Sequence, residues 1–199
     1  MQVFTMASSA PASPYLPGSL QDHFLLSMPH MDDTNFDHTV TYICEHNEHG
    51  AMGIIINRPM DMVTSDLFQH LGLECESVPE QPVYAGGPVK NDRGFILHSP
   101  TEEAWDSSYD ITDQLSLTTS VDILRAIGQN RAPEQFLIAL GYAGWGAEQL
   151  EQEMSDNVWL SCPANLDIMF RTPAEERLQA AAATLGVNIH LLTSQSGHA

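Results

Sequence analysis

The chain has 199 residues, enough for one domain or two small ones, and its formal charge at pH 7 is −19, because 26 acidic side chains outnumber 7 Lys and Arg. Non-specific binding to nucleic acid needs a basic face that displaces counterions from phosphates, and a polybasic membrane anchor needs clustered cations. The composition therefore excludes both classes, and we expect no direct contact with nucleic acid or membrane.

In chain order, the sequence predicts a succession of short strands and helices. Strands are predicted where apolar and β-branched runs are bounded by turn-forming residues, and helices where apolar residues recur every three or four positions. The predicted elements are strands at 23–28, 39–46 and 51–57, a helix at 64–71, strands at 95–98 and 115–118, a helix at 121–128, a strand at 136–142, a helix at 147–154, a strand at 158–161, helices at 165–171 and 173–185, and a strand at 188–192.

Specific local signals support several of these elements. The strands at 39–46 and 51–57 flank a four-residue turn that ends in Gly50, a pattern typical of a hairpin. Residues 136–142 are apolar throughout, so this run predicts a central strand covered on both faces. Residues 172–175 read Thr-Pro-Ala-Glu, which is a capping box with proline at the first helical position.

The order of the elements predicts one α+β domain at residues 20–192. Strands occur as hairpin-like neighbours and also alternate with helices, so the sheet should be mixed. No linker rich in Pro, Gly or Ser interrupts this region, and a two-lobed arrangement around the acidic loop at 99–108 is the alternative. Residues 193–199 are expected to fray.

Cysteine usage and the N-terminus indicate a cytoplasmic protein. Cys44, Cys75 and Cys162 are odd in number and widely spaced, which is typical of reduced thiols rather than of a disulfide framework or a zinc ribbon. Residues 1–19 lack Lys, Arg and the apolar run of an export signal, so they predict a disordered leader, with Met6 as an alternative start. No stretch approaches the ~18 apolar residues that a membrane-spanning helix needs.

The first candidate for chemistry is the string Cys44, His46 and His49. These side chains suit zinc, but no fourth ligand lies nearby, so we predict no metal ion. Strand alternation puts Cys44 and His46 on one face about 7 Å apart, too far for a thiolate nucleophile and its base to share a hydrogen bond. The favoured interpretation is a buried thiol beside polar groups at a turn.

The second candidate is the pair Asn57 and Arg58, which follows an apolar strand at the kind of strand end where α/β proteins assemble their sites. Arg58 and Arg93 are rare cations on an acidic molecule, and a guanidinium suits bidentate recognition of carboxylate or phosphate. The favoured alternative is that each arginine closes an internal salt bridge with an acidic side chain.

Two glycine-rich segments complete the candidates. Gly86 and Gly87 offer turned backbone amides that can form an anion nest. No phosphate-loop motif surrounds them and no helix signal follows, so a tight turn or bulge is favoured. Residues 141–146 set Tyr142 and Trp145 among small residues, which is typical of packing or, if the rings are exposed, of a binding anchor.

Several blocks of the sequence also match a known pattern. The blocks are HFLLSMP at 23–29, YICEHN at 42–47, GAMGIIINRP at 50–59, YAGGPV at 84–89, DRGFILH at 92–98, TSVDIL at 119–124, GYAGW at 141–145 with QLE at 149–151, and NVWL at 157–160. Together they resemble the YqgE/AlgH family from about residue 20 to the C-terminus, and most closely its AlgH branch. Glu148 departs from the pattern, since the family tends to have Gly before Gln-Leu-Glu.

This resemblance implies a single α+β domain in the bacterial cytoplasm, with a mixed, strongly curved, mainly antiparallel sheet packed with helices. The family is named for a proposed role in the transcriptional regulation of alginate production, and no catalytic residue is carried over from it. The matched positions are therefore candidates for a ligand or partner site. They are His46, Asn57, Arg58, Gly86, Gly87, Arg93 and His98.

The function predicted from these observations is an indirect transcriptional or accessory regulator. It would act through a protein or small-molecule partner rather than by binding DNA, and it would need no cofactor. One alternative is a hydrolase-like enzyme that uses Cys44 or His46 in a site shared with Asn57, Arg93 and His98. Another is an interaction module whose contact is the loop at 142–145.

Overall fold

The computed structural model describes residues 18–29, 33–74 and 79–188 of the chain. The predicted leader therefore lies outside the described residues except for residues 18 and 19. The predicted tail at 193–199 and the last predicted strand, apart from Asn188, also lie outside them, as does Cys75.

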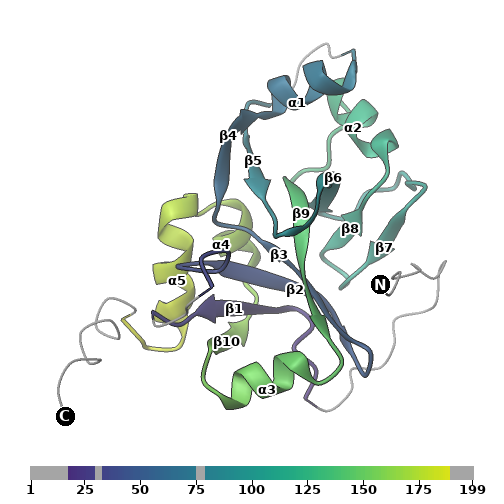
Figure 1. Ribbon diagram of the computed structural model, residues 1–199. Helices are drawn as coiled ribbons and strands as arrows, with labels where there is room; N and C mark the ends of the chain where they lie inside the picture. The colour runs from purple at the N-terminus through teal and green to yellow at the C-terminus, as the bar shows by residue number, and fades with distance from the viewer. Residues whose placement is uncertain (1–17, 30–32, 75–78, 189–199) are drawn as a thin grey trace.

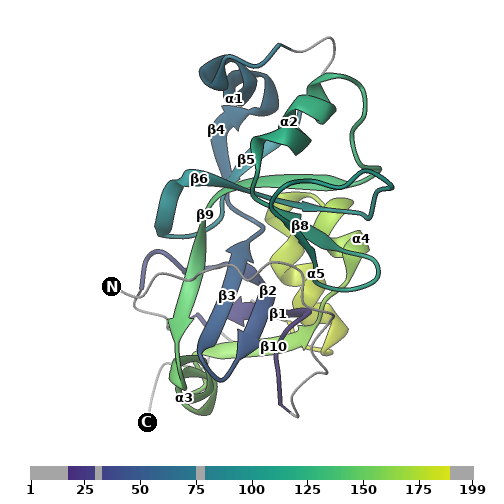
Figure 2. The same cartoon turned by 90° about the vertical axis from the view of Figure 1, so that its right-hand side faces the viewer.

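One long strand, β9 (Phe136–Gly146), joins two groups of strands into a single ten-stranded sheet within the described residues. The strands of one group are β10 (Trp159–Pro163), β1 (His23–Ser27), β2 (Val40–Asn47) and β3 (Gly50–Ile55), in that order up to β9. The other group is β6 (Val89–His98), β8 (Ser116–Thr118) and β7 (Ser108–Asp110), with β5 (Pro82–Ala85) beside β9 and β4 (Pro59–Val63) beside β5. Figure 2 shows β9 running from one group to the other.

The strand pairing confirms the predicted fold class. Strands β5 and β9 are parallel, and every other pairing in the described sheet is antiparallel, so the sheet is mixed and mainly antiparallel. The predicted hairpin is also confirmed, since Asn47 pairs with Gly50 at the end of β2 and β3. Because β9 belongs to both groups, the sheet curls through one α+β domain.

Short helices cover the sheet. They are α1 (Thr64–Leu71), α2 (Val121–Gly128), α3 (Gln149–Ser155), α4 (Leu166–Phe170), the 3-10 turn η1 (Ala174–Glu176) and α5 (Arg177–Thr184). In Figure 1, α1 and α2 lie with β4–β8, α3 lies at the far end of β9, and α4 and α5 lie beside β1. Among the described residues, no helix has the length and apolar character that a membrane crossing requires.

The core consists of three apolar clusters that the helices close. The largest holds the inward side chains of β1, β2, β6 and β9 and is covered by Leu178 and Ala181 of α5. A second lies under α1 and α2, where Phe68 and Ile127 pack against Ile138 of β9. The third lies under α3, on the opposite face of β2 and β9 from the first. The strand β9 contributes to all three, as expected for a strand covered on both faces.

Some local predictions are corrected by the structure. The strand predicted at 51–57 ends at Ile55, and Pro59 begins β4, a first position that requires no backbone N–H. The strand predicted at 95–98 is longer and begins at Val89 as β6, and its pairing with β9 shifts between Val89 and Gly94. The strands β5 and β7 also lie where the sequence patterns predict none.

The capping box at 172–175 is absent. The 3-10 turn η1 precedes α5, and Pro173 takes an extended ψ of 142° just before it. The Thr172 hydroxyl donates to the carbonyl of Asp167 at 3.3 Å, so it turns back toward α4 rather than capping α5. The Thr172 hydroxyl therefore bonds to the preceding helix, α4, and makes no cap for the following one.

Candidate functional site

Asn57 and Arg58 hold the loop that leads into β2. The Arg58 guanidinium donates to the carbonyls of Asn35 at 2.7 Å, Thr34 at 2.9 Å and Asp37 at 3.0 Å. Asn57 accepts from the backbone N–H of Val40 at 2.7 Å and donates to the carbonyl of His38 at 2.9 Å. The favoured interpretation of Arg58 as an internal salt bridge is therefore wrong, because its partners in the described chain are backbone oxygens.

Gly86 and Gly87 lie where the chain crosses β9 at close range. The Gly86 N–H donates to the carbonyl of Leu140 at 2.8 Å. Gly87 has φ +153°, and a Cβ there would lie 2.1 Å from the carbonyl carbon of Tyr142. Opposite it, Gly141 has φ +76°, and its Cβ would lie 2.4 Å from the Gly87 oxygen. This geometry argues against an anion nest at Gly86, because the Gly86 amide is already used in the crossing.

Cys44 and His46 face opposite sides of β2. The pairing of β2 with β3 shifts between Ile43 and Glu45, so a bulge at Cys44 adds one residue to the strand. The expectation that strand alternation puts Cys44 and His46 on one face is wrong for this reason. Cys44 is fully buried in the largest cluster, where desolvation, with a smaller effect of the Glu45 charge, raises the pKa of its thiol.

His46 joins the segment before β1 to α3. Its Nδ1 accepts from the Leu20 N–H at 2.9 Å, and its Nε2 lies 2.9 Å from Glu151 Oε1. Since Nδ1 is an acceptor, the proton is on Nε2 and is donated to the carboxylate. Both ring nitrogens are thus occupied, and neither is directed at a thiol.

Arg93 and His98 both contact the end of β8. Arg93 donates to Thr119 Oγ1 at 3.1 Å. His98 is 2% exposed, and its Nδ1 donates to the Ser99 carbonyl while its Nε2 lies 2.8 Å from Thr118 Oγ1. Burial lowers the pKa of His98, so this imidazole is neutral at pH 7.

Residues 142–145, predicted as a loop, belong to the strand β9, and Trp145 packs inside the protein. Trp145 is 4% exposed, and its indole N–H donates to Glu153 Oε2 at 2.8 Å. The same oxygen accepts from the indole of Trp159, also at 2.8 Å, and Phe36 packs against both indole rings. The ring of Trp145 is therefore an internal contact and is not presented as a binding anchor.

The structure brings two of the candidate residues into one pocket. Arg58 and Gly87 line a pocket of about 280 Å³, together with Asn35, Met60 and Asn91. His46 lies toward the other end of β2, and Arg93 and His98 lie on β6, so they do not share it. The candidate residues identified from the sequence are thus spread over the fold.

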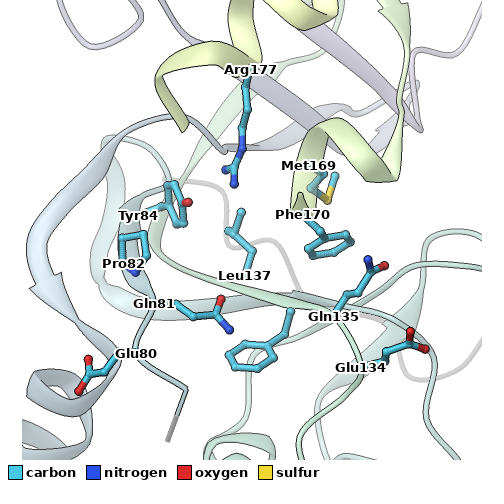
Figure 3. Close-up of a pocket in the computed structure, with 11 residues that line it drawn as sticks. Glu80, Gln81, Pro82, Tyr84, Glu134, Gln135, Leu137, Met169, Phe170 and Arg177 are labelled. Atoms are coloured by element: carbon cyan, nitrogen blue, oxygen red, sulfur yellow. The ribbon is translucent and has the colours of Figure 1, made fainter. Parts of the chain in front are cut away.

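A larger pocket, of about 440 Å³, lies between β5, β9, α4 and α5. Sequence reasoning does not single it out, because its walls come from segments far apart in the chain. Figure 3 shows Arg177 entering it from α5, with Tyr84 and Pro82 on one side and Phe170 on the other. One sequence signal does point to it: Arg177 follows Ala174 by three residues and precedes Ala181 by four, so it lies on the apolar stripe of the helix.

Arg177 is a buried cation held by backbone carbonyls. Its side chain is buried at 5% exposure, its Nε donates to the Thr172 carbonyl at 2.9 Å, and its Nη1 donates to the Ile56 carbonyl. The guanidinium carbon lies 5.0 Å from the centroid of the Tyr84 ring, a cation–π arrangement. Within the described parts of the chain, no carboxylate lies within ion-pair distance of it.

Comparison with known proteins shows that the chain is similar to the members of one family. A family model described as AlgH-like matches residues 24–190. A UPF0301 protein of Thioalkalivibrio sulfidiphilus is 53% identical over 179 residues, which cover 89% of this chain and 96% of that protein. A UPF0301 protein of Shewanella loihica is 51% identical over 185 residues, which cover 91% of this chain and 99% of that protein.

Two solved structures have the same fold. The solution structure of the AlgH protein from Pseudomonas aeruginosa matches with a TM-score of 0.73 and 49% identity, covering 94% of this chain and 100% of that one. A crystal structure of a Corynebacterium diphtheriae protein matches with a TM-score of 0.70 over 91% of this chain and 95% of that one. The second is 18% identical, so that likeness concerns the fold alone.

Proposed function

Because the chain belongs to the AlgH-like family, we propose that it is a regulatory or accessory protein of the bacterial cytoplasm that acts through a small-ligand or protein contact and does not bind DNA itself. The proposal takes up the regulatory role for which the family is named. It rests chiefly on one observation, which is how the few cations of the chain are used.

Most of the 7 cations are engaged within the protein. Arg131 pairs with Glu103 and Arg171 pairs with Asp167. Arg58 donates to loop carbonyls and Arg177 is buried. The other cations are Lys90, Arg93 and Arg125, which are exposed. A DNA-binding protein typically makes about six to ten contacts between its cationic side chains and phosphates. Three cations are too few for this, and the 26 acidic residues oppose it.

The same geometry disfavours the hydrolase alternative. A thiol nucleophile needs thiolate character and a base within hydrogen-bond reach. Cys44 is fully buried with a raised pKa, and His46 lies on the other face of β2 with both ring nitrogens engaged. Asn57, Arg93 and His98 lie on other elements and do not complete a site around either residue.

The test is a fluorescence-anisotropy titration of labelled duplex DNA with the purified chain at low salt, where electrostatic binding is strongest. Non-specific DNA-binding proteins bind with Kd values of about 1–100 µM even at physiological salt. We expect no change in anisotropy over that protein concentration range. Salt-sensitive binding of DNA would contradict the proposal. A parallel assay with chromogenic esters is expected to show no turnover that depends on Cys44 or His46.

A further inference from the structure

The pocket of about 440 Å³ contains a positive charge that has no negative partner among the described residues. Transfer of a cation out of water is costly, and buried charges in proteins are therefore almost always paired. From the described residues, Arg177 receives only the partial negative charges of two carbonyl oxygens and of the Tyr84 ring. These contacts reduce the cost of burial but leave the net charge uncompensated.

The guanidinium retains donors for a further partner. Arginine has five N–H donors, and the contacts with Thr172 and Ile56 use Nε and one hydrogen of Nη1. No acceptor for Nη2 is found among residues 18–29, 33–74 and 79–188. In Figure 3 the guanidinium points from α5 into the pocket, toward Leu137. A carboxylate in the pocket would accept a charge-assisted hydrogen bond from it and neutralise its charge.

The walls below Arg177 combine apolar side chains, which can contact the body of a ligand, with polar groups. Tyr84, Phe136, Leu137, Met169 and Phe170 line the pocket, which provides aromatic and aliphatic surface on both sides. The amide side chains of Gln81 and Gln135 and the hydroxyl of Tyr84 are neutral polar groups of the lining residues. A volume of about 440 Å³ lies within the usual range of small-molecule sites, roughly 300–1,000 Å³.

The charges around the pocket favour a ligand with one negative charge over a ligand with two. Glu80 and Glu134 belong to the lining and are exposed, and Figure 3 shows their carboxylates turned away from the centre. These two groups and the net charge of −19 repel anions in proportion to the ligand charge. A dianionic phosphate is therefore disfavoured relative to a monocarboxylate.

We propose that this pocket binds a small organic monocarboxylate with an aromatic or branched apolar body, with its carboxylate on the guanidinium of Arg177. The inference names a site and a ligand class for the small-ligand contact of the proposed function, and in that sense rests on it. The carboxylate takes the hydrogen bonds of the guanidinium, while the body lies against Tyr84, Leu137 and Phe170.

The test is a chemical-shift titration of isotope-labelled full-length protein with three probes that each carry a phenyl ring: 3-phenylpropionate, the neutral 3-phenylpropanol, and the dianionic phenyl phosphate. We expect 3-phenylpropionate to bind with a Kd of about 1 mM or below, as befits so small a ligand. Its shifts should be centred on Gln81, Tyr84, Leu137, Phe170 and Arg177. The alcohol and the phosphate should each bind at least about tenfold more weakly.

Variants assign the binding to the guanidinium. Arg177→Met should remove the preference for carboxylate over alcohol. The control is Arg171→Met, which removes an exposed cation at the end of α4 and should leave binding unchanged. Because Arg177→Met also removes two buried hydrogen bonds, a second variant covers the case in which it does not fold. Gln81→Glu places a like charge in the lining and should weaken carboxylate binding by about tenfold, while Glu80→Gln should strengthen it.

Several outcomes would overturn the inference. They are equal binding of alcohol and carboxylate, tighter binding of phenyl phosphate, shifts centred away from the pocket, no shift with any probe at 10-fold the expected Kd, or carboxylate binding indifferent to Gln81→Glu. None of these outcomes would contradict the proposed function, which the DNA titration tests separately. Conversely, DNA binding would overturn the proposed function whether or not the pocket takes a carboxylate.

Discussion

Cys44 and His46 are two residues apart in one strand, yet a bulge turns their side chains to opposite faces of the sheet. The thiol enters the core beneath α5, and the imidazole bonds to Glu151 of α3. The two side chains therefore do not share one face of β2 and cannot act together as a nucleophile and its base.

Cys44 is expected to be inert in the folded protein, because burial raises the pKa of its thiol and closes it to reagents. In a Cys75→Ser, Cys162→Ser background, iodoacetamide at neutral pH should label Cys44 only as fast as the protein unfolds. Mass spectrometry in native buffer and in urea checks this. Fast labelling in native buffer, with the fold intact by circular dichroism, would contradict the buried position.

His98 is expected to make stability depend on pH in the acid range. Burial holds its folded pKa below the ordinary value of 6.5, so the unfolded state binds the proton first as pH falls. The free energy of unfolding should therefore decrease from about pH 6.5 down to the folded pKa, with a slope of at most about 1.4 kcal/mol per pH unit from this group.

The comparison of wild type with His98→Gln isolates that contribution, since the other histidines titrate in both proteins. Urea unfolding from pH 5 to pH 8 should show the two stability curves converging as pH falls. Parallel curves across this range would mean that the imidazole does not lose a proton on folding.

Gly87→Ala is expected to destabilise the fold severely. An added Cβ would lie 2.1 Å from the Tyr142 carbonyl carbon, so β9 and the β5–β6 connection would have to separate. We expect a loss of at least about 4 kcal/mol in the free energy of unfolding, or no folding at all.

Gly72→Ala provides the matched control for that substitution. Gly72 also has a positive φ, +63°, but no atom lies within 4 Å of the Cβ position. The left-handed conformation alone costs about 1–2 kcal/mol. Equal losses for the two variants in urea unfolding would show that the crossing of the chains is not the cause.

Glu153→Ala is expected to destabilise the contact between α3 and β10. One carboxylate oxygen accepts from the indoles of Trp145 and Trp159, each at 2.8 Å, so the substitution leaves two buried donors unpaired. A loss of about 3 kcal/mol follows from the cost of such groups. Tryptophan fluorescence should shift as well, whereas the exposed Glu148→Ala should change neither quantity.

The amino-acid sequence by itself determined those helices and strands whose signals come from residues close together in the chain. The hairpin at 39–57, the central apolar strand at 136–142 and the helix ended by Gly72 are confirmed, because turn geometry and apolar periodicity act between near neighbours. The sequence blocks likewise indicated the family and, through it, the curved mixed sheet.

The tertiary structure decided which side chains meet. Arg177, Ile56 and Tyr84 are far apart in the chain, and only the tertiary structure brings the Ile56 carbonyl and the Tyr84 ring to the Arg177 guanidinium. The same holds for Arg58, whose partners are loop carbonyls rather than the acids that its charge suggests. Such contacts depend on strand order, register and bulges, which are set by the packing of the whole chain and not by the pattern of any one segment.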